Sequence, residues 1–357
     1  HSSASGSRRG FLRLARGVGF TPTHSLENSV RRSVCMTLIT AAAVSVTLTS
    51  CADSVPETEA VATEPMAKAV PDVQAMNAFY YYDNVDAAWT FYRDVLGFET
   101  VADYGFAKIM RVAPASYLTL VDQAEGMHSS DEPKSVTLAV VTEQVEGWYE
   151  YLTSAGVMMR GEMKEYEAGR PHDGFVAIDP EGYLLEFERF NPHPENVTLM
   201  PMLAQIEPLG PAGGDRPSEL TVQATVLWLY YRDIPAMESF YEELLGVDLL
   251  VDQGWAKVYE ASRTGFVGLV DGERGLHNAT EEKAVTVSFI TSDVAAWLER
   301  AKKQELSLRT PDLTDESGRV SVFVGYDPEG YFLEWDTFLD VEGNETLLPL
   351  LATEAGR

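Results

Sequence analysis

Apolar and polar positions along residues 77–203 alternate in a way that predicts short strands separated by amphipathic helices. After an aromatic run at 79–82, Trp89, Tyr92 and Leu96 recur at helical spacing, and Gly97 follows where a helix would end. Two further strands are predicted at 106–112 and 117–121. The pattern then restarts with a strand at 136–141, a helix at 145–155 and strands at 174–178 and 183–190.

The same order of elements is written a second time. A shift of 149 residues places Phe91 and Tyr92 on Phe240 and Tyr241, and a shift of 148 places "DPEGYLLEF" on "DPEGYFLEW". The match joins residues 77–203 to 226–351. We therefore predict an α+β protein with two tandem domains, each made of two strand–helix–strands modules. The domains are placed at 77–206 and 223–357, and the Gly/Pro-rich segment 207–222 is predicted to be their linker.

The residues before the repeat have the order of parts of an export signal. Arg31 and Arg32 precede a short apolar run that ends in Leu-Thr-Ser-Cys at Cys51, which resembles a bacterial lipobox. Residues 1–50 are predicted to be the signal and upstream segment, and 51–76 a flexible tether. Ala52 favours export to a lipid-anchored position in the bacterial envelope, on the periplasmic side of the outer membrane. The alternative is a chance cysteine after a hydrophobic segment.

Charge and cysteine content argue against several classes of function. The formal net charge is −28, and so acidic a surface repels phosphate backbones, which makes nucleic acid an unsuitable partner. Cys35 and Cys51 both precede the repeat. The predicted domains therefore have neither a disulfide framework nor a Cys-ligated zinc site.

Two kinds of motif resemble a known family. "NVDAAWTFYRDVLGFE" and "DIPAMESFYEELLGVD", with the two DPEG segments, are similar to the vicinal oxygen chelate superfamily, which includes glyoxalase I, bleomycin resistance proteins and extradiol dioxygenases. The resemblance covers residues 77–351. It implies that two βαβββ modules pair into a half-open barrel whose concave face holds a ligand or a metal.

The resemblance also implies where a metal would be held, and this sequence departs from that pattern. The four implied positions of each copy are Asn77, Thr119, Thr137 and Glu186 in the first and Val226, Gly268, Thr286 and Glu334 in the second. One carboxylate does not hold a divalent ion, since open sites usually have about three protein ligands. We therefore expect no metal and no cofactor. His128, His172 and His277 are interpreted as surface or turn residues, and His128 and His277 could instead rim a pocket.

Strand alternation indicates what would face the concave side. Glu186 shares a face with Leu184 and Glu188, and Glu334 shares one with Phe332 and Asp336, opposite an apolar face expected to pack on helices. Glu186 and Glu334 are the candidate catalytic residues; alternatively, they only solvate an open strand face. Lys108 and Lys257 are expected to face solvent on edge strands. The expected ligand-binding residues are Asn77, Phe79, Tyr81, Thr137, Arg170, Trp228, Tyr230, Thr286 and Arg319.

Three functions remain open at this point. The leading hypothesis is an exported, lipid-anchored protein that binds a small organic molecule without metal in an aromatic cavity. The second is an enzyme, a glyoxalase-like lyase, isomerase or dioxygenase, either metal-dependent with unusual ligands or metal-free with a glutamate as general base. The third is a non-catalytic interaction module of the cell envelope.

Overall fold

The computed structural model describes residues 70–164 and 166–355. The predicted signal at 1–50, Cys51 and the first part of the predicted tether lie outside the described residues. Within the described ranges, no helix is long and apolar enough to cross a membrane.

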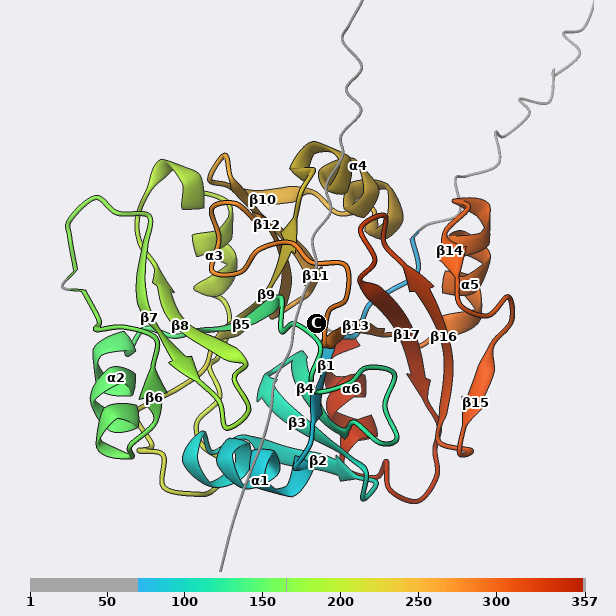
Figure 1. The fold of residues 1–357 in the computed structure, drawn as a ribbon, viewed down its shortest axis with the longest axis horizontal. Coiled ribbons are helices and arrows are strands. Elements are labelled where there is room, and N and C mark those ends of the chain that lie inside the picture. Colours follow the sequence, from blue (N-terminus) through green and yellow to red (C-terminus); the bar gives the residue numbers. More distant parts are fainter. Residues whose placement is uncertain (1–69, 165, 356–357) are drawn as a thin grey trace, which may run out of the picture. The chain divides into compact units, whose positions relative to one another are not determined.

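Four modules follow one another along the chain, each with a strand, a helix and then antiparallel strands (Figure 1). The first contains β1 (Ala75–Tyr82), α1 (Val85–Thr90), a π-type turn (Phe91–Val95), β2 (Glu99–Asp103), β3 (Ala107–Ala113) and β4 (Ser116–Asp122). The second contains β5 (Val136–Val141), α2 (Val145–Ser154), β6 (Met158–Met159), β7 (His172–Ile178) and β8 (Leu184–Phe190). A 3-10 turn (Pro194–Asn196) and α3 (Leu199–Leu203) lead out of it.

The second copy repeats this order. The third module contains β9 (Ala224–Tyr231), α4 (Ile234–Leu245), β10 (Leu249–Asp252), β11 (Ala256–Ser262) and β12 (Gly265–Asp271). The fourth contains β13 (Val285–Ile290), α5 (Val294–Lys303), β14 (Ser307–Leu308), β15 (Thr314–Glu316), β16 (Val320–Tyr326) and β17 (Phe332–Phe338), followed by α6 (Leu347–Ala355). The predicted α+β class and the tandem modules are confirmed.

The modules pair across the two copies. Sheet A has the strand order β14-β16-β17-β13-β1-β4-β3-β2 and joins the first module to the fourth. Sheet B has the order β10-β11-β12-β9-β5-β8-β7-β6 and joins the third module to the second. The seams are the antiparallel pairs β1–β13 and β5–β9. The two copies therefore interleave, and neither concave sheet is built from one copy alone.

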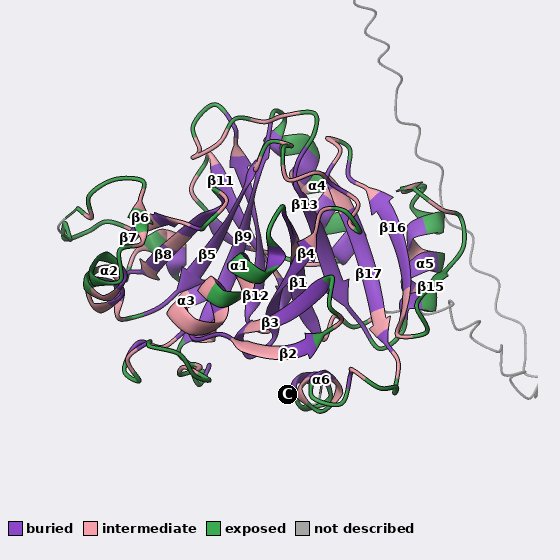
Figure 2. Cartoon of the chain, turned by 60° about the horizontal axis from the view of Figure 1, so that its bottom comes forward, coloured by how far each residue is buried: buried purple, intermediate pink, exposed green. Residues whose placement is uncertain are grey.

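Helix boundaries follow the cap residues that the sequence supplies. The side chains of Asn84, Asp233 and Asp293 accept hydrogen bonds from the third residue of α1, α4 and α5. Gly246 ends α4 with a φ of 66°, a left-handed conformation that glycine adopts without steric cost. Figure 2 shows the strands largely buried, whereas α1, α2 and α5 each turn an exposed side outward.

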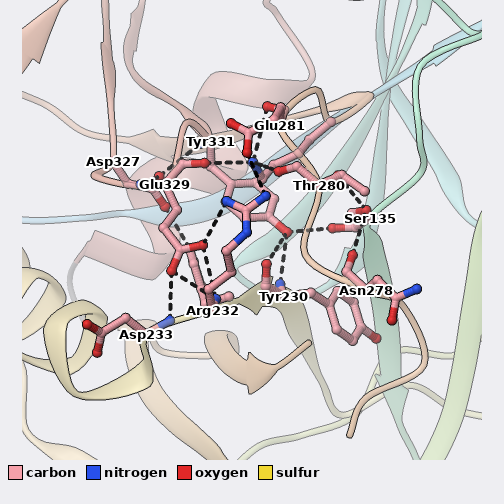
Figure 3. Close-up of polar contacts among 12 residues, drawn as sticks. Ser135, Tyr230, Arg232, Asp233, Asn278, Thr280, Glu281, Asp327, Glu329 and Tyr331 are labelled. Carbon is pink, nitrogen blue, oxygen red and sulfur yellow. Dashed lines mark hydrogen bonds and ion pairs between the residues drawn. The ribbon is translucent and has the colours of Figure 1, made fainter. Parts of the chain in front are cut away.

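The repeated DPEGY turn braces each sheet from the other one. The Tyr331 hydroxyl, next to sheet A, accepts from the Tyr230 backbone N–H at 2.8 Å and donates to the Ser135 carbonyl at 2.6 Å (Figure 3). Those two groups flank the β5–β9 seam of sheet B. Tyr183 forms the equivalent bonds with the Tyr81 N–H and the Ala284 carbonyl, beside the seam of sheet A.

The carboxylates of the same turns join the two modules of one copy. Glu329 accepts from the backbone N–H groups of Arg232 and Asp233, where β9 leads into α4 (Figure 3). Asp327 accepts from the Tyr231 hydroxyl at 2.8 Å and from its own turn. The fold has two seams, and the repeated turn serves both of them. Each DPEGY turn bonds to the seam of the sheet to which its own module does not belong.

The segment predicted as a linker packs against the folded modules. Leu209 and Val222 pair through their backbones, and the Arg216 guanidinium, 5% exposed, donates to the Leu96 carbonyl and lies over the Trp148 ring. This packing holds the link between the copies against α2 and the end of the first helix.

Candidate functional site

Each sheet has a hollow on its concave face, and one strand, β17 in sheet A and β8 in sheet B, supplies two acidic side chains to it. Hollow A has a cavity volume of about 130 Å³. Hollow B has one of about 230 Å³, so each has room for a small molecule. Hollow A is lined mainly by Phe79, Tyr81, Tyr104, Phe106, Ile109, Thr119, Val121, Arg319, Glu334, Asp336 and Phe338. Hollow B is lined by His172, Glu186, Glu188, Trp228, Tyr230, Gln253, Trp255, Ala256, Val270, Arg274, Gly275 and Leu276.

The seam strands give each hollow a tyrosine that is fixed by a threonine. The Tyr81 hydroxyl on β1 and the Thr286 hydroxyl on β13 lie 2.7 Å apart. The Tyr230 hydroxyl on β9 and the Thr137 hydroxyl on β5 lie 2.8 Å apart. Each bond crosses the seam, so both modules must be paired for either tyrosine to be held in place.

Burial makes the carboxyl groups of both hollows hard to ionise. In hollow B, burial raises the pKa of Glu186 to about 7, and burial and the neighbouring Glu186 raise the pKa of Glu188 well above its ordinary value. In hollow A, burial raises the pKa of Asp336 to about 7, and burial and the Asp336 charge raise that of Glu334. Each pair therefore keeps at least one proton near neutral pH.

The two carboxyl pairs differ in their hydrogen bonds. In hollow A the Ser288 hydroxyl donates to Asp336 at 2.6 Å, and a hydrogen bond between the two carboxyl groups lowers the pKa of Asp336 and raises that of Glu334. In hollow B the residue equivalent to Ser288 is Ala139. Ala139 lies opposite Glu186 on the neighbouring strand, as Ser288 lies opposite Glu334. One carboxyl oxygen of Glu188, which is 2% exposed, has no hydrogen-bond partner.

The structure brings most of the predicted site residues together. Phe79, Tyr81, Arg319 and Glu334 line hollow A, and Glu186, Trp228 and Tyr230 line hollow B. Thr137 forms a hydrogen bond with Tyr230, and Thr286 forms one with Tyr81. Asn77 accepts a hydrogen bond from Thr119. Arg170 lines neither hollow; its side chain is half exposed and pairs with Glu167 at 2.6 Å.

Several lining residues were not foreseen. His172 opens β7 and reaches hollow B, although its position had suggested a surface or turn residue. Trp255 and Arg274 come from loops, and the Arg274 guanidinium lies 5.2 Å from the centre of the Trp255 ring. An aromatic residue next to a hairpin glycine, as in "QGW" and "DYGF", is the signal that could have indicated Trp255 in hollow B and Tyr104 and Phe106 in hollow A.

The metal-ligand positions that the fold implies do not fit a divalent ion here. The pairing of the first and fourth modules places Asn77, Thr119, Thr286 and Glu334 at the four positions of sheet A. Three of these already bond to protein groups, since Thr119 donates to Asn77 and the Thr286 hydroxyl bonds to the Tyr81 hydroxyl. In hollow B a side chain at Gly268 has no space, since its Cβ would lie 2.0 Å from the Trp228 ring. Among the described residues, no three His, Cys, Asp or Glu side chains gather where they could hold a metal ion.

The fold defines a class of protein in which βαβββ modules pair into concave sheets. Comparison with known proteins agrees with this class. Residues 67–187 and 222–335 match the model of the Glyoxalase/Bleomycin resistance protein/Dioxygenase superfamily, and the chain belongs to this superfamily. The structure is similar to glyoxalase I from Zea mays, with 17% identity, a TM-score of 0.52, and coverage of 79% of this chain and 97% of the other.

A second solved structure gives a similar result. A putative dioxygenase from Bacillus subtilis has 13% identity and a TM-score of 0.52, with coverage of 76% of this chain and 86% of the other. No curated protein matches the chain in sequence. At these identities the likeness shows the fold alone.

Proposed function

We propose that this protein binds a small organic molecule on the concave face of its sheets without using a metal ion. The observation that supports this most is hollow B, where two carboxyl groups and an indole lie in an aromatic cavity and polar atoms remain without partners. A concave, mostly apolar surface with a few convergent polar groups is the usual form of a small-molecule site.

A second candidate function, metal-free proton transfer, rests on the carboxyl group of Glu186. General bases work best when their pKa is close to the working pH, and burial raises that of Glu186 to about 7. In this function Glu186 would accept a proton from a bound molecule, and the neighbouring Glu188 would stay protonated.

The test is a thermal melt of the full chain with and without a chelator, combined with metal analysis and a screen of small organic ligands. We expect no stoichiometric metal, no change in melting temperature on chelation, and a rise with selected ligands that is reduced in Glu186→Gln. A bound metal whose removal lowers the melting temperature would contradict the proposal.

We also propose that the protein is exported and anchored by a lipid at Cys51. The order of charged, apolar and small residues before Cys51 supports this. In a Gram-negative host, the wild type should fractionate with outer membranes and Cys51→Ala should not. Equal fractionation of the two proteins would contradict lipid attachment.

A further inference from the structure

Hollow B contains two acidic groups that no base neutralises. Glu186 and Glu188 both line it, and no ion pair joins either of them to a Lys, Arg or His in the described part of the chain. Burial, rather than a neighbouring cation, dominates the pKa shifts of both groups. A buried acidic pair without a counter-charge either keeps its proton or attracts a cation from outside.

The charged and titratable groups around the pair do not supply that cation. His172 from β7 has a pKa lowered by burial, and burial lowers that of His277 to about 4, so both rings are neutral at pH 7. Arg274 is exposed at the rim over Trp255, and Arg160 donates to the Leu276 carbonyl. Tyr230, from the seam strand β9, is neutral because burial raises its pKa.

Unpartnered atoms indicate that hollow B receives a polar ligand. Glu188 is 2% exposed and one of its oxygens has no partner; the indole N–H of Trp228, a side chain that is 6% exposed, also has none. Leaving such groups unpaired costs about 1–3 kcal/mol each. Both residues line the cavity; the Glu188 oxygen can accept from an N–H of a bound molecule, whereas the Trp228 N–H needs an acceptor.

The walls of hollow B favour one charge class of ligand. Trp228, Tyr230 and Trp255 line the same hollow as the acidic pair, and aromatic faces attract cations, tryptophan most strongly. From the uncompensated carboxyl pair, the unpartnered Glu188 oxygen and these aromatic walls, we propose that hollow B binds a small organic ammonium compound. The cation takes the place of the proton that the pair otherwise holds, and that proton passes to solvent.

This inference rests on the proposed function and can fail independently of it. The test is isothermal titration calorimetry of the full chain with three one-ring probes that differ in charge: benzylamine, benzyl alcohol and benzoate. We expect benzylamine to bind at least ~10-fold more tightly than benzyl alcohol, and benzoate to bind most weakly. Comparing buffers of different ionisation enthalpy at pH 6 should show release of about one proton per benzylamine, and at pH 8, where Glu186 is already mostly ionised and the amine is still a cation, much less.

Matched variants locate the effect. The double variant Glu186→Gln with Glu188→Gln keeps the shapes of both side chains and removes the charge that the pair can carry, so it should weaken benzylamine about 10-fold while changing benzyl alcohol by less than about 2-fold. Glu150→Gln makes the same type of substitution at an exposed position on α2 and should change neither. Circular dichroism and melting curves of both variants check that they are folded.

The outcomes separate the two proposals. Benzyl alcohol or benzoate binding as tightly as benzylamine would overturn the cation inference and leave the metal-free pocket standing. Benzylamine binding without proton release at pH 6, or unchanged in the double variant, would also overturn it. If none of the three probes binds, the cation inference fails, and if the wider ligand screen is also negative, the proposed function fails with it.

Discussion

Hollow A and hollow B occupy equivalent places in two sheets of the same design and differ in whether the second carboxyl group of the pair has a hydroxyl partner. In hollow A, the Ser288 hydroxyl donates a hydrogen bond to Asp336. In hollow B, Ala139 offers no hydroxyl and Glu188 keeps an oxygen without a partner. One small substitution on a seam strand thus separates a carboxyl group that accepts from a hydroxyl from one with hydrogen-bonding capacity left for a ligand.

The rims of the hollows differ as well. In hollow A, Arg319 lies 5.4 Å from the centre of the Tyr104 ring, and Tyr104 donates to Asn344 beyond β17. In hollow B the place of Tyr104 is taken by Gln253, which contacts His172 at 3.3 Å. The two copies share the same order of strands, and the side chains at the rims of the two hollows differ.

The largest effect that tests this comparison comes from the bracing tyrosines. Tyr331→Phe removes two buried hydrogen bonds beside the seam of sheet B, and we expect the free energy of unfolding to fall by about 2–3 kcal/mol. Benzylamine binding at hollow B should weaken, because Tyr230 loses its backbone support. Chemical denaturation and calorimetry measure the two effects.

Tyr183→Phe is the matched control for this change. It loses the equivalent bonds beside sheet A, so we expect a similar loss of stability without weaker benzylamine binding at hollow B. Equal weakening of binding by both variants would show that the tyrosines do not brace the sheets separately.

The elements of the fold were predictable from sequence, but the pairing of the modules was not. Periodicity fixes which residues share a strand face, so the inward orientation of Glu186 and Glu334 followed from alternation. Which strand edges meet depends on contacts between residues about 200 positions apart, such as Tyr81 with Thr286. A repeat match makes two separate domains the simpler expectation, and it carries no information about interleaving.

Three predictions about single residues, Lys108, Lys257 and His172, were wrong for the same reason. Lys108 was expected to face solvent on an edge strand; instead β3 lies between β2 and β4, and Lys108 is 4% exposed and pairs with Asp103 at 2.7 Å. Lys257 is 8% exposed and pairs with Asp252 in the second copy. His172 reaches hollow B because β7 pairs with β8. Each outcome depends on which strand pairs with which neighbour, and the pattern of apolar and polar residues along one strand does not specify this.

The next effect in size is the pH dependence of stability. The pKa of Glu186 and that of Glu188 are higher in the folded chain than in the unfolded one, so the unfolded state loses its protons first as the pH rises. Their contribution is fully present below about pH 4.5; that of Glu186 is lost as the pH rises through about 7, and that of Glu188 is lost at higher pH. The double variant Glu186→Gln with Glu188→Gln should therefore be more stable than wild type at pH 8, by about 2 kcal/mol.

Melts between pH 5 and pH 8 measure this difference. The gain from the double variant should be smallest at pH 5 and largest at pH 8. Glu150→Gln, which removes an exposed charge, should follow the wild type throughout. A double variant that loses stability at pH 8 would show that the ionised pair has a favourable partner in the folded chain.

The smallest effects come from exchanging the residues that distinguish the hollows. Ser288→Ala removes the hydroxyl that donates to Asp336, and we expect a loss of about 1 kcal/mol in the free energy of unfolding. Ala139→Ser places a hydroxyl at the equivalent position of hollow B, where Glu188 has an oxygen to accept from it, and we expect a gain of less than about 1 kcal/mol. Since that hydroxyl competes with a ligand for Glu188, benzylamine should bind Ala139→Ser more weakly than wild type. Denaturation and calorimetry on the same samples test both changes, and unaltered binding in Ala139→Ser would show that the missing hydroxyl is not what leaves hollow B open to a ligand.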